Sequence, residues 1–245
     1  HLLLASLLLL MELNCENLFD SSHDEGKHDT EFLPEGARRW TSQRYHHKLR
    51  QIARTILSVA EPPALVALCE VENDSVMHHL THHGMLRNLD YGYFITSSAD
   101  VRGIDVALMY SPYSFRLIDS HSVRVKPIKG MRPTRDILYA SGVTVSGDTL
   151  HVIVAHLPSR RGGEKYSRPF RMAAARQVAA VVDSIYNNVS AVAKIIVAGD
   201  FNDYSNSESI QLLCSKRMTE VSQGAKGCNG AKGTYRYQGF WGSLD

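Results

Sequence analysis

Apolar residues recur at intervals of three and four in two long stretches of the chain, a spacing that places them on one face of a helix. The first stretch covers residues 43–60 and is stopped by Pro62 and Pro63, and the second covers residues 168–187. Shorter apolar or alternating stretches predict β-strands. These predicted strands are residues 64–69, 103–110, 137–145, 150–155 and 195–198.

The order of these elements predicts a layered α/β fold with helices outside stacked strands. Some of the strands are apolar throughout and others alternate, as a sheet buried on both faces requires. With 245 residues, 44% of them hydrophobic, the chain is long enough to bury a sizeable core. No repeat or linker is evident, so we expect a single domain over residues 11–245.

Residues 1–10 are largely apolar and resemble the centre of a signal peptide or membrane anchor. They could instead extend the first strand, because ten residues are too few to span a bilayer and no small-residue cleavage site separates them from Met11. The sequence therefore leaves two locations open. The protein is either exported, and then periplasmic, secreted or membrane-anchored, or it is cytoplasmic.

Charge and cysteine content restrict the functions only slightly. The chain has 27 Lys+Arg and 25 Asp+Glu, a net charge of +2, so the molecule as a whole does not indicate a nucleic-acid or membrane partner. Binding of an anion must rely on local clusters. The four cysteines form no C-x-x-C pair, although Cys214 and Cys228 could form a disulfide in an exported protein.

Polar residues of the kind that bind metals or catalyse reactions follow several predicted strands. They lie at residues 14–17, at residues 70–74, at His156 and at residues 200–203. If these strands belong to one sheet, their ends bring the polar side chains to one rim. We expect the active site at that rim.

Glu70 directly follows a strand that is apolar throughout, where a carboxylate is costly to bury unless it is paired or bound to a metal. A hard cation such as Mg²⁺ prefers one or two carboxylates, with water and substrate phosphate as the other ligands. The alternative is a solvated strand end. Asn14 is a weaker signal, because asparagine at a strand end often caps a turn.

Gly199 permits close approach of the backbone after a buried strand, and Asp200 and Asn202 point the same way if that strand continues. A carboxylate beside an amide can orient a water for attack on phosphorus while the amide holds a phosphoryl oxygen. The alternative is an ordinary Asx turn.

His156 ends another strand and precedes a basic, glycine-containing loop. A histidine at that place could donate a hydrogen bond to a developing phosphorane or protonate the leaving oxygen. Arg160 and Arg161 in the loop offer donors for phosphate oxygens, and arginine suits bidentate contact. The alternative is a solvated basic loop.

Together these residues resemble the endonuclease/exonuclease/phosphatase family, which includes pancreatic-type DNases, apurinic endonucleases, neutral sphingomyelinases and inositol-polyphosphate 5-phosphatases. The resemblance rests on four segments spread over nearly the whole chain, and the last is the most specific. They are Asn14-Cys15-Glu16-Asn17, Leu68-Cys69-Glu70, Ala155-His156 and Gly199-Asp200-Phe201-Asn202.

The resemblance implies a four-layered α/β sandwich of two stacked, mainly antiparallel sheets flanked by helices. It implies that Glu70 is the main ligand of Mg²⁺ or Mn²⁺, with Asn14 and Glu16 lining the metal site. It places Arg135, within Thr134-Arg135-Asp136, where several family members contact the scissile phosphate.

The chain departs from the family pattern at its end, because the family's final Ser-Asp-His motif is absent. Gly242-Ser243-Leu244-Asp245 resembles the earlier segment whose Asp orients that histidine. Asp245 is therefore a predicted catalytic residue whose histidine would lie downstream, and we expect the sandwich to lack its last strands here.

The histidine-rich stretch of residues 78–83 contains two pairs spaced four apart, which a helix could offer to zinc. No third ligand is evident, so we interpret it as a solvated face.

The sequence thus predicts a metal-dependent phosphoesterase that hydrolyses a phosphodiester by in-line attack of water. Tyr166 and Phe170 among basic residues favour a nucleic-acid substrate over a small-molecule or lipid phosphate. The rival from another class is an inactive phosphate-binding module. No stable protein partner is implied, and we expect a monomer.

Overall fold

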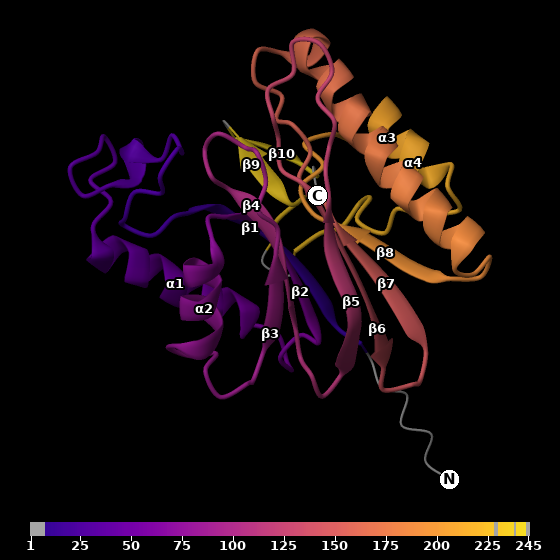
Figure 1. The fold of residues 1–245 in the computed structure, drawn as a ribbon, viewed down its shortest axis with the longest axis horizontal. Helices are drawn as coiled ribbons and strands as arrows, with labels where there is room; N and C mark the ends of the chain where they lie inside the picture. The colour runs from indigo at the N-terminus through magenta and orange to yellow at the C-terminus, as the bar shows by residue number, and fades with distance from the viewer. Residues whose placement is uncertain (1–7, 228–229, 238, 244–245) are drawn as a thin grey trace.

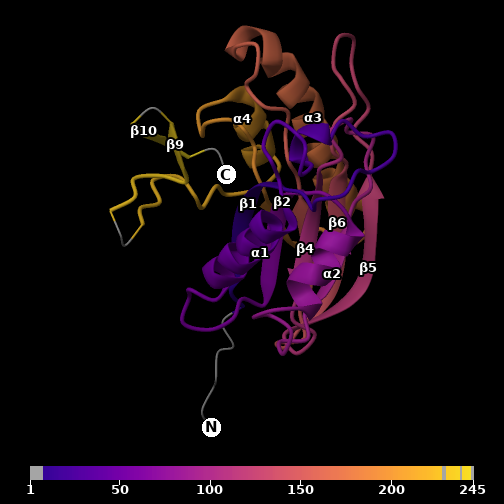
Figure 2. The ribbon, with the colours of Figure 1, turned by 90° about the vertical axis from the view of Figure 1, so that its left-hand side faces the viewer.

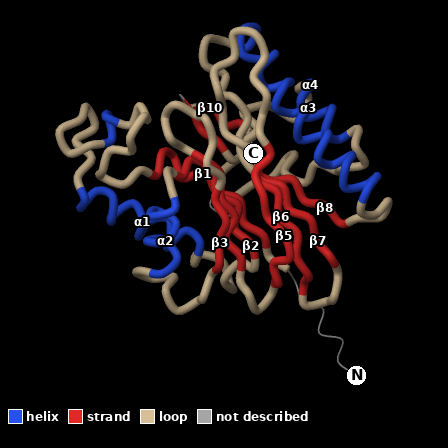
Figure 3. The backbone as a smooth tube through the Cα atoms, in the orientation of Figure 1, coloured by secondary structure: helices blue, strands red, loops and turns tan. Residues whose placement is uncertain are grey.

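A computed structural model of the chain describes residues 8–227, 230–237 and 239–243. Two four-stranded sheets stack against each other in the centre, and helices cover the outer face of each (Figures 1 and 3). Reading across the molecule in Figure 3, the layers are helices, sheet, sheet and helices. This arrangement confirms the predicted four-layered α/β sandwich.

The first sheet has the strand order β1-β2-β4-β3. Strands β1 and β2 are parallel, and the other pairs are antiparallel. Helices α1 and α2 pack on its outer face. The bounds of these elements are β1 Leu10–Leu18, α1 Ser42–Ile56, β2 Leu65–Val71, α2 Asp74–His82, β3 Gly92–Ile95 and β4 Asp105–Tyr110.

The second sheet has the strand order β5-β6-β7-β8, and only β7 and β8 are parallel. Helices α3 and α4 pack on its outer face. The bounds are β5 Phe115–Val123, β6 Ile137–Thr144, β7 Thr149–Val154, α3 Glu164–Asn188, β8 Lys194–Ala198 and α4 Glu208–Cys214. A small hairpin, β9 Tyr235–Tyr237 with β10 Phe240–Gly242, lies apart from both sheets (Figure 2), and a 3₁₀ turn, η1 Thr30–Phe32, lies between β1 and α1 in the chain.

Three apolar clusters hold the layers together. One lies under α1 and α2, one under α3 and α4, and the third between the two sheets. In the middle cluster Leu65, Leu108 and Leu138 are fully buried. Burying such a side chain stabilises the fold by roughly 1.5–3 kcal/mol. The central cluster fixes how the sheets face each other, and hence how their strand ends meet.

Most predicted elements are present, with shifted ends. The helix predicted for residues 43–60 ends at Ile56, where Leu57 takes a non-helical conformation. The helix predicted for residues 168–187 begins earlier, at Glu164, directly after Gly163 with φ +94°, and contains Pro169. Two strands of the main sheets were not predicted, β3 and β5, nor were the hairpin strands β9 and β10.

Other expectations concern the ends of the chain and the cysteines. Residues 1–7, Cys228 and Asp245 lie outside the described residues, so the leader, disulfide and Asp245 predictions stay predictions. In the part of the chain that the structure describes, no helix has the length and apolar character needed to cross a membrane.

Candidate active site

The predicted site residues come together at one edge of the sandwich, where both parallel strand pairs end. Asn14 and Glu70 belong to β1 and β2, and His156 and Asp200 follow β7 and β8. The sequence analysis reached a common rim on the condition that these strands share one sheet, and that condition is not met, because each sheet supplies one pair. The carboxyl ends of both pairs meet at the seam between the sheets.

The end of β1 contains a bulge where it pairs with β2. The register passes from Asn14 opposite Cys69 to Leu18 opposite Val71, so β1 has extra residues there. Glu16, Asn17 and Glu70 all have positive φ, at 53°, 63° and 61°. Each such residue costs about 1–3 kcal/mol, which is typical of functional sites. The prediction that Asn14 and Glu70 follow their strands was therefore wrong, because both lie within strands that are irregular at this point.

The bulge ties the first sheet's three candidate metal-site residues, Asn14, Glu16 and Glu70, into a network. The backbone N–H of Asn17 donates to Oε2 of Glu70 at 2.7 Å. Oδ1 of Asn14 accepts from the N–H of Glu16 at 2.8 Å, and its Nδ2 donates to Oδ2 of Asp200 at 2.9 Å. Asn14 thus links the two sheets across the seam.

Asp200 lies in a turn. Strand β8 ends at Ala198, and a Cβ on Gly199 would lie 2.0 Å from the carbonyl oxygen of Ala155, so only glycine fits. Oδ1 of Asp200 accepts from the N–H of Asn202 at 2.8 Å, an Asx turn, which corrects the expected strand continuation. The turn still directs Oδ2 of Asp200 to Asn14.

His156 is buried between the carboxylates from both sheets. Its Nε2 lies 3.7 Å from Oδ2 of Asp200 and 4.0 Å from Oε1 of Glu70. Among the described residues its Nδ1 has no hydrogen-bond partner. The carboxylates favour the protonated ring, but burial and the charges of Arg135 and Arg102 act more strongly and hold the pKa of His156 well below its usual value. The imidazole is therefore neutral near pH 7.

Cys69 is a site residue that the sequence analysis missed. Its Sγ accepts from the N–H of Asp200 at 3.4 Å and lies 3.9 Å from the carbonyl oxygen of Ala155, toward which the thiol can donate. The thiol is fully buried, and burial raises its pKa well above the usual value. One side chain next to Glu70 thus contacts the backbone just before His156 and at Asp200. An apolar run containing a cysteine gives no sign of this role.

Arg135 lies beneath the rim. Its guanidinium donates to Asp100 at 3.2 Å and to the carbonyl oxygen of Leu157 at 2.9 Å, and only 6% of the residue is exposed. Nδ2 of Asn202 donates to the same Leu157 oxygen at 3.1 Å. These contacts hold the segment after His156 against the Asp200 turn, and the predicted contact of Arg135 with phosphate stays a prediction.

A cleft of about 750 Å³ opens beside these residues. It is lined by six of the predicted site residues together with two tyrosines and two further polar residues of the rim. The predicted ones are Asn14, Glu16, Asp200, Asn202, Arg160 and Arg161, and the others include Tyr204, Tyr235, Ser159 and Thr234. The cleft is the space into which a substrate can fit.

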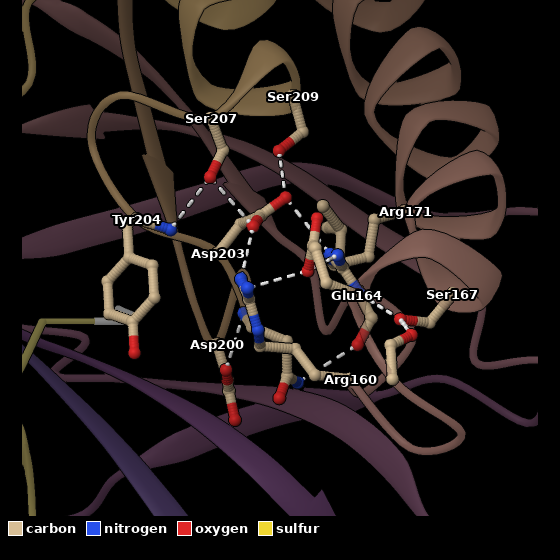
Figure 4. A network of polar contacts seen from close by, with 12 residues as sticks. Arg160, Glu164, Ser167, Arg171, Asp200, Asp203, Tyr204, Ser207 and Ser209 are labelled. Atoms are coloured by element: carbon tan, nitrogen blue, oxygen red, sulfur yellow. Dashed lines mark hydrogen bonds and ion pairs between the residues drawn. The ribbon is translucent and has the colours of Figure 1, made fainter.

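Arg160 reaches the cleft from a buried ionic network (Figure 4). Its guanidinium donates to Asp203 at 2.8 Å, lies 2.6 Å from Glu164 and stacks 4.9 Å from the ring of Tyr204. Asp203 also accepts from the fully buried Arg171 at 2.9 Å. Burial alone would raise the pKa of Asp203, but hydrogen bonds from serines and Arg171 outweigh it and lower that pKa. The network fixes one predicted phosphate-binding arginine beside the Asp200 turn.

The donor set fits a hard cation. In the described residues no group of three or more His, Cys, Asp or Glu has the arrangement of a metal centre. Mg²⁺, however, is commonly held by only one or two carboxylates, with water and substrate as further ligands. The carboxylates of Glu70 and Asp200 converge here on a neutral imidazole, with the amide of Asn14 beside them. Such a concentration of oxygen donors suits Mg²⁺ or Mn²⁺.

A two-sheet α/β sandwich with carboxylate, amide and imidazole groups at the seam defines a DNase-like protein. The sequence matches the model of the Endonuclease/Exonuclease/phosphatase family over residues 10–245. The chain belongs to this family, whose members hydrolyse phosphate esters.

Solved structures agree on the fold. A mannosyl-6-phosphatase from Bacteroides thetaiotaomicron shares 14% identity with a TM-score of 0.60, over 85% of this chain and 70% of that one. A humanised D. rerio TDP2 shares 19% with a TM-score of 0.53, over 88% and 68%. The human nocturnin catalytic domain shares 22% with a TM-score of 0.52, over 67% of this chain and 60% of that domain. The search of curated proteins gave no match.

Proposed function

We propose that the protein is a divalent-metal-dependent phosphoesterase that hydrolyses a phosphodiester by in-line attack of water. One observation carries the proposal: carboxylates from both sheets converge on the buried imidazole of His156, and one of them, Asp200, also lines an open cleft. Structural frameworks rarely place two carboxylates beside a buried neutral ring, whereas hydrolytic sites need such groups to hold and activate water.

Each group has a role that its surroundings support. Glu70, with Asn14 and Glu16, would hold Mg²⁺ or Mn²⁺, which supplies positive charge for the phosphate oxygens. Asp200 is fixed by two hydrogen bonds and can orient or deprotonate the attacking water. His156 is neutral, so it can donate one N–H as a hydrogen bond to a phosphoryl oxygen, whereas protonation of the leaving group would first require the ring to gain a proton.

The cleft favours a nucleic-acid phosphodiester. Arg160 and Arg161 lie along it with the rings of Tyr204 and Tyr235, a combination of donors for the backbone and surfaces for bases. The aromatic pair expected from the sequence, Tyr166 and Phe170, forms an edge-on contact on α3 and is not part of the cleft lining.

A substrate screen tests the proposal. We expect hydrolysis of bis-nitrophenyl phosphate and of plasmid DNA or RNA with Mg²⁺ or Mn²⁺, and none with excess chelator. Hydrolysis of sphingomyelin or a sugar phosphate alone would indicate a lipid or small-molecule substrate. Full activity in excess chelator would exclude the metal role of Glu70, and binding of nucleic acid without turnover would indicate an inactive phosphate-binding module.

A further inference from the structure

Lys48 on α1 reaches the bulge of β1 from outside the sheet. Its ammonium donates to the carbonyl oxygen of Glu16 in a short hydrogen bond and to that of Asn17 at 3.2 Å. Residues 16 and 17 are the consecutive left-handed residues of the bulge. The lysine therefore holds the backbone at its most strained point.

The contact continues to Glu70 through one peptide group. The carbonyl oxygen of Glu16 and the N–H of Asn17 belong to the same peptide, and that N–H donates to Oε2 of Glu70 at 2.7 Å. A cation on the oxygen of a peptide polarises the group and strengthens its N–H as a donor, because hydrogen bonds in a chain reinforce one another. The positive charge of Lys48 is thereby relayed to the Glu70 carboxylate.

We propose that Lys48 is a positioning residue that fixes the Glu70 carboxylate for metal binding through the Glu16–Asn17 peptide. The inference rests on the proposed function, since it takes Glu70 as the metal ligand. With Oε2 held by the peptide, Oε1 is the oxygen that faces His156 at 4.0 Å and the shared site. Mutation of a residue that hydrogen-bonds a metal ligand commonly lowers metal affinity by about 10- to 100-fold.

A purely structural role for Lys48 is the alternative, and the chain offers a matched control. Lys27 also donates through its ammonium to two backbone carbonyls, those of Ser98 and Asp100, both at 3.1 Å. It is half-buried like Lys48, but its contacts do not include the Glu70 peptide. Lys27→Met therefore reproduces the loss of a backbone clamp without disturbing the relay.

The first measurement needs no metal and no substrate. Amide proton shifts are recorded by NMR for the unmodified protein and for Lys48→Met, Lys48→Arg and Lys27→Met. Losing the cation should move the Asn17 amide proton upfield in Lys48→Met, because its bond to Glu70 weakens. Lys48→Arg should restore most of the shift and Lys27→Met should leave it unchanged. An unchanged Asn17 resonance in folded Lys48→Met would overturn the relay.

The second measurement is Mn²⁺ affinity by titration calorimetry without substrate. Lys48→Met should bind Mn²⁺ about tenfold more weakly, Lys48→Arg close to normally, and Lys27→Met normally even where its melting temperature falls. Equal affinity in Lys48→Met and the unmodified protein would make Lys48 structural. If the unmodified protein binds Mn²⁺ but hydrolyses no ester in the screen, the proposed function fails while the Lys48 inference stands.

Discussion

At the scale of single residues, the site depends on side chains that serve different steps. Nε2 of His156 and Oδ2 of Asp200 lie 3.7 Å apart at the seam between the sheets. Neither residue belongs to the apolar clusters that hold the layers together. Their removal should therefore affect the reaction more than the fold.

His156→Ala and Asp200→Asn should each lower kcat by roughly a hundredfold with smaller changes in KM, the effect of losing an acid-base or charge-stabilising group. The measurement is steady-state hydrolysis of bis-nitrophenyl phosphate. His151→Gln is the matched control, because His151 is also buried on β7, and its ring bonds to the hydroxyl of Tyr139 at 2.8 Å instead of facing the two carboxylates. Normal kcat in a His156 variant that merely folds poorly would assign that residue to the scaffold.

Glu72 gives a prediction for the dependence of stability on pH. Burial, with the nearby carboxylates of Asp20, Asp24 and Asp29, raises the pKa of Glu72 to about 8. The folded state then keeps a proton that the unfolded state releases near pH 4.5, so this group makes the fold less stable as pH rises toward 8.

Glu72→Gln should remove that loss. Between pH 6 and 8 the unmodified protein should lose roughly 2 kcal/mol of unfolding free energy relative to Glu72→Gln, since each pKa unit corresponds to about 1.4 kcal/mol. Urea unfolding at both pH values in chelator measures this difference. Parallel curves for the two proteins would show that Glu72 is ionised in the folded state.

At the scale of elements, α3 is joined to the turn after β8 by a buried ion pair. Nε of Arg171 donates to Oδ2 of Asp203 at 2.9 Å, and Ser207 and Ser209 donate to the same carboxylate (Figure 4). Arg171 is completely buried and also pairs with Glu164 at 2.5 Å, so two carboxylates balance its charge. Because Asp203 lies three residues after Asp200, the pair anchors the Asp200 turn to α3.

Asp203→Ala should lower the free energy of unfolding by about 3 kcal/mol, because it leaves the buried Arg171 with Glu164 as its one carboxylate partner among the described residues and takes the acceptor from Ser207 and Ser209. Asp183→Ala provides the comparison, since Asp183 also lies on α3 but pairs with Lys216 at 2.5 Å near the surface. That exposed pair should contribute about 1 kcal/mol or less. Similar losses in both variants, measured by urea unfolding, would contradict the role given to the buried pair.

Elements with a strong apolar signal could be predicted from the sequence, and those without it could not. Strand β2 is buried almost throughout and was evident, whereas β5 is largely exposed at a sheet edge and β3 has only four residues. The segments of the candidate site could also be recognised, because their residues resemble sequence motifs of the family. Cys69 and Lys48 were not, since their contacts join segments that only the folded chain brings together.

At the scale of the whole molecule, the order along the chain matches the division into sheets. Strands β1 to β4 form the first sheet within residues 10–110, and β5 to β8 form the second within residues 115–198. The two sheets share the central apolar cluster. The chain passes from one to the other once, through the short connection of residues 111–114, where Tyr113 is 71% exposed.

This division makes the protein a candidate for fragment complementation. A chain cut between Pro112 and Tyr113 gives one piece with Asn14 and Glu70 and another with His156 and Asp200. Exposed connections tolerate such cuts, and the complementary apolar faces should bring the pieces together again. Each piece alone should be inactive, and mixing them should restore metal-dependent hydrolysis, with a rate that rises with the concentration of the scarcer piece. Hydrolysis by either piece alone would mean that one sheet carries a complete site.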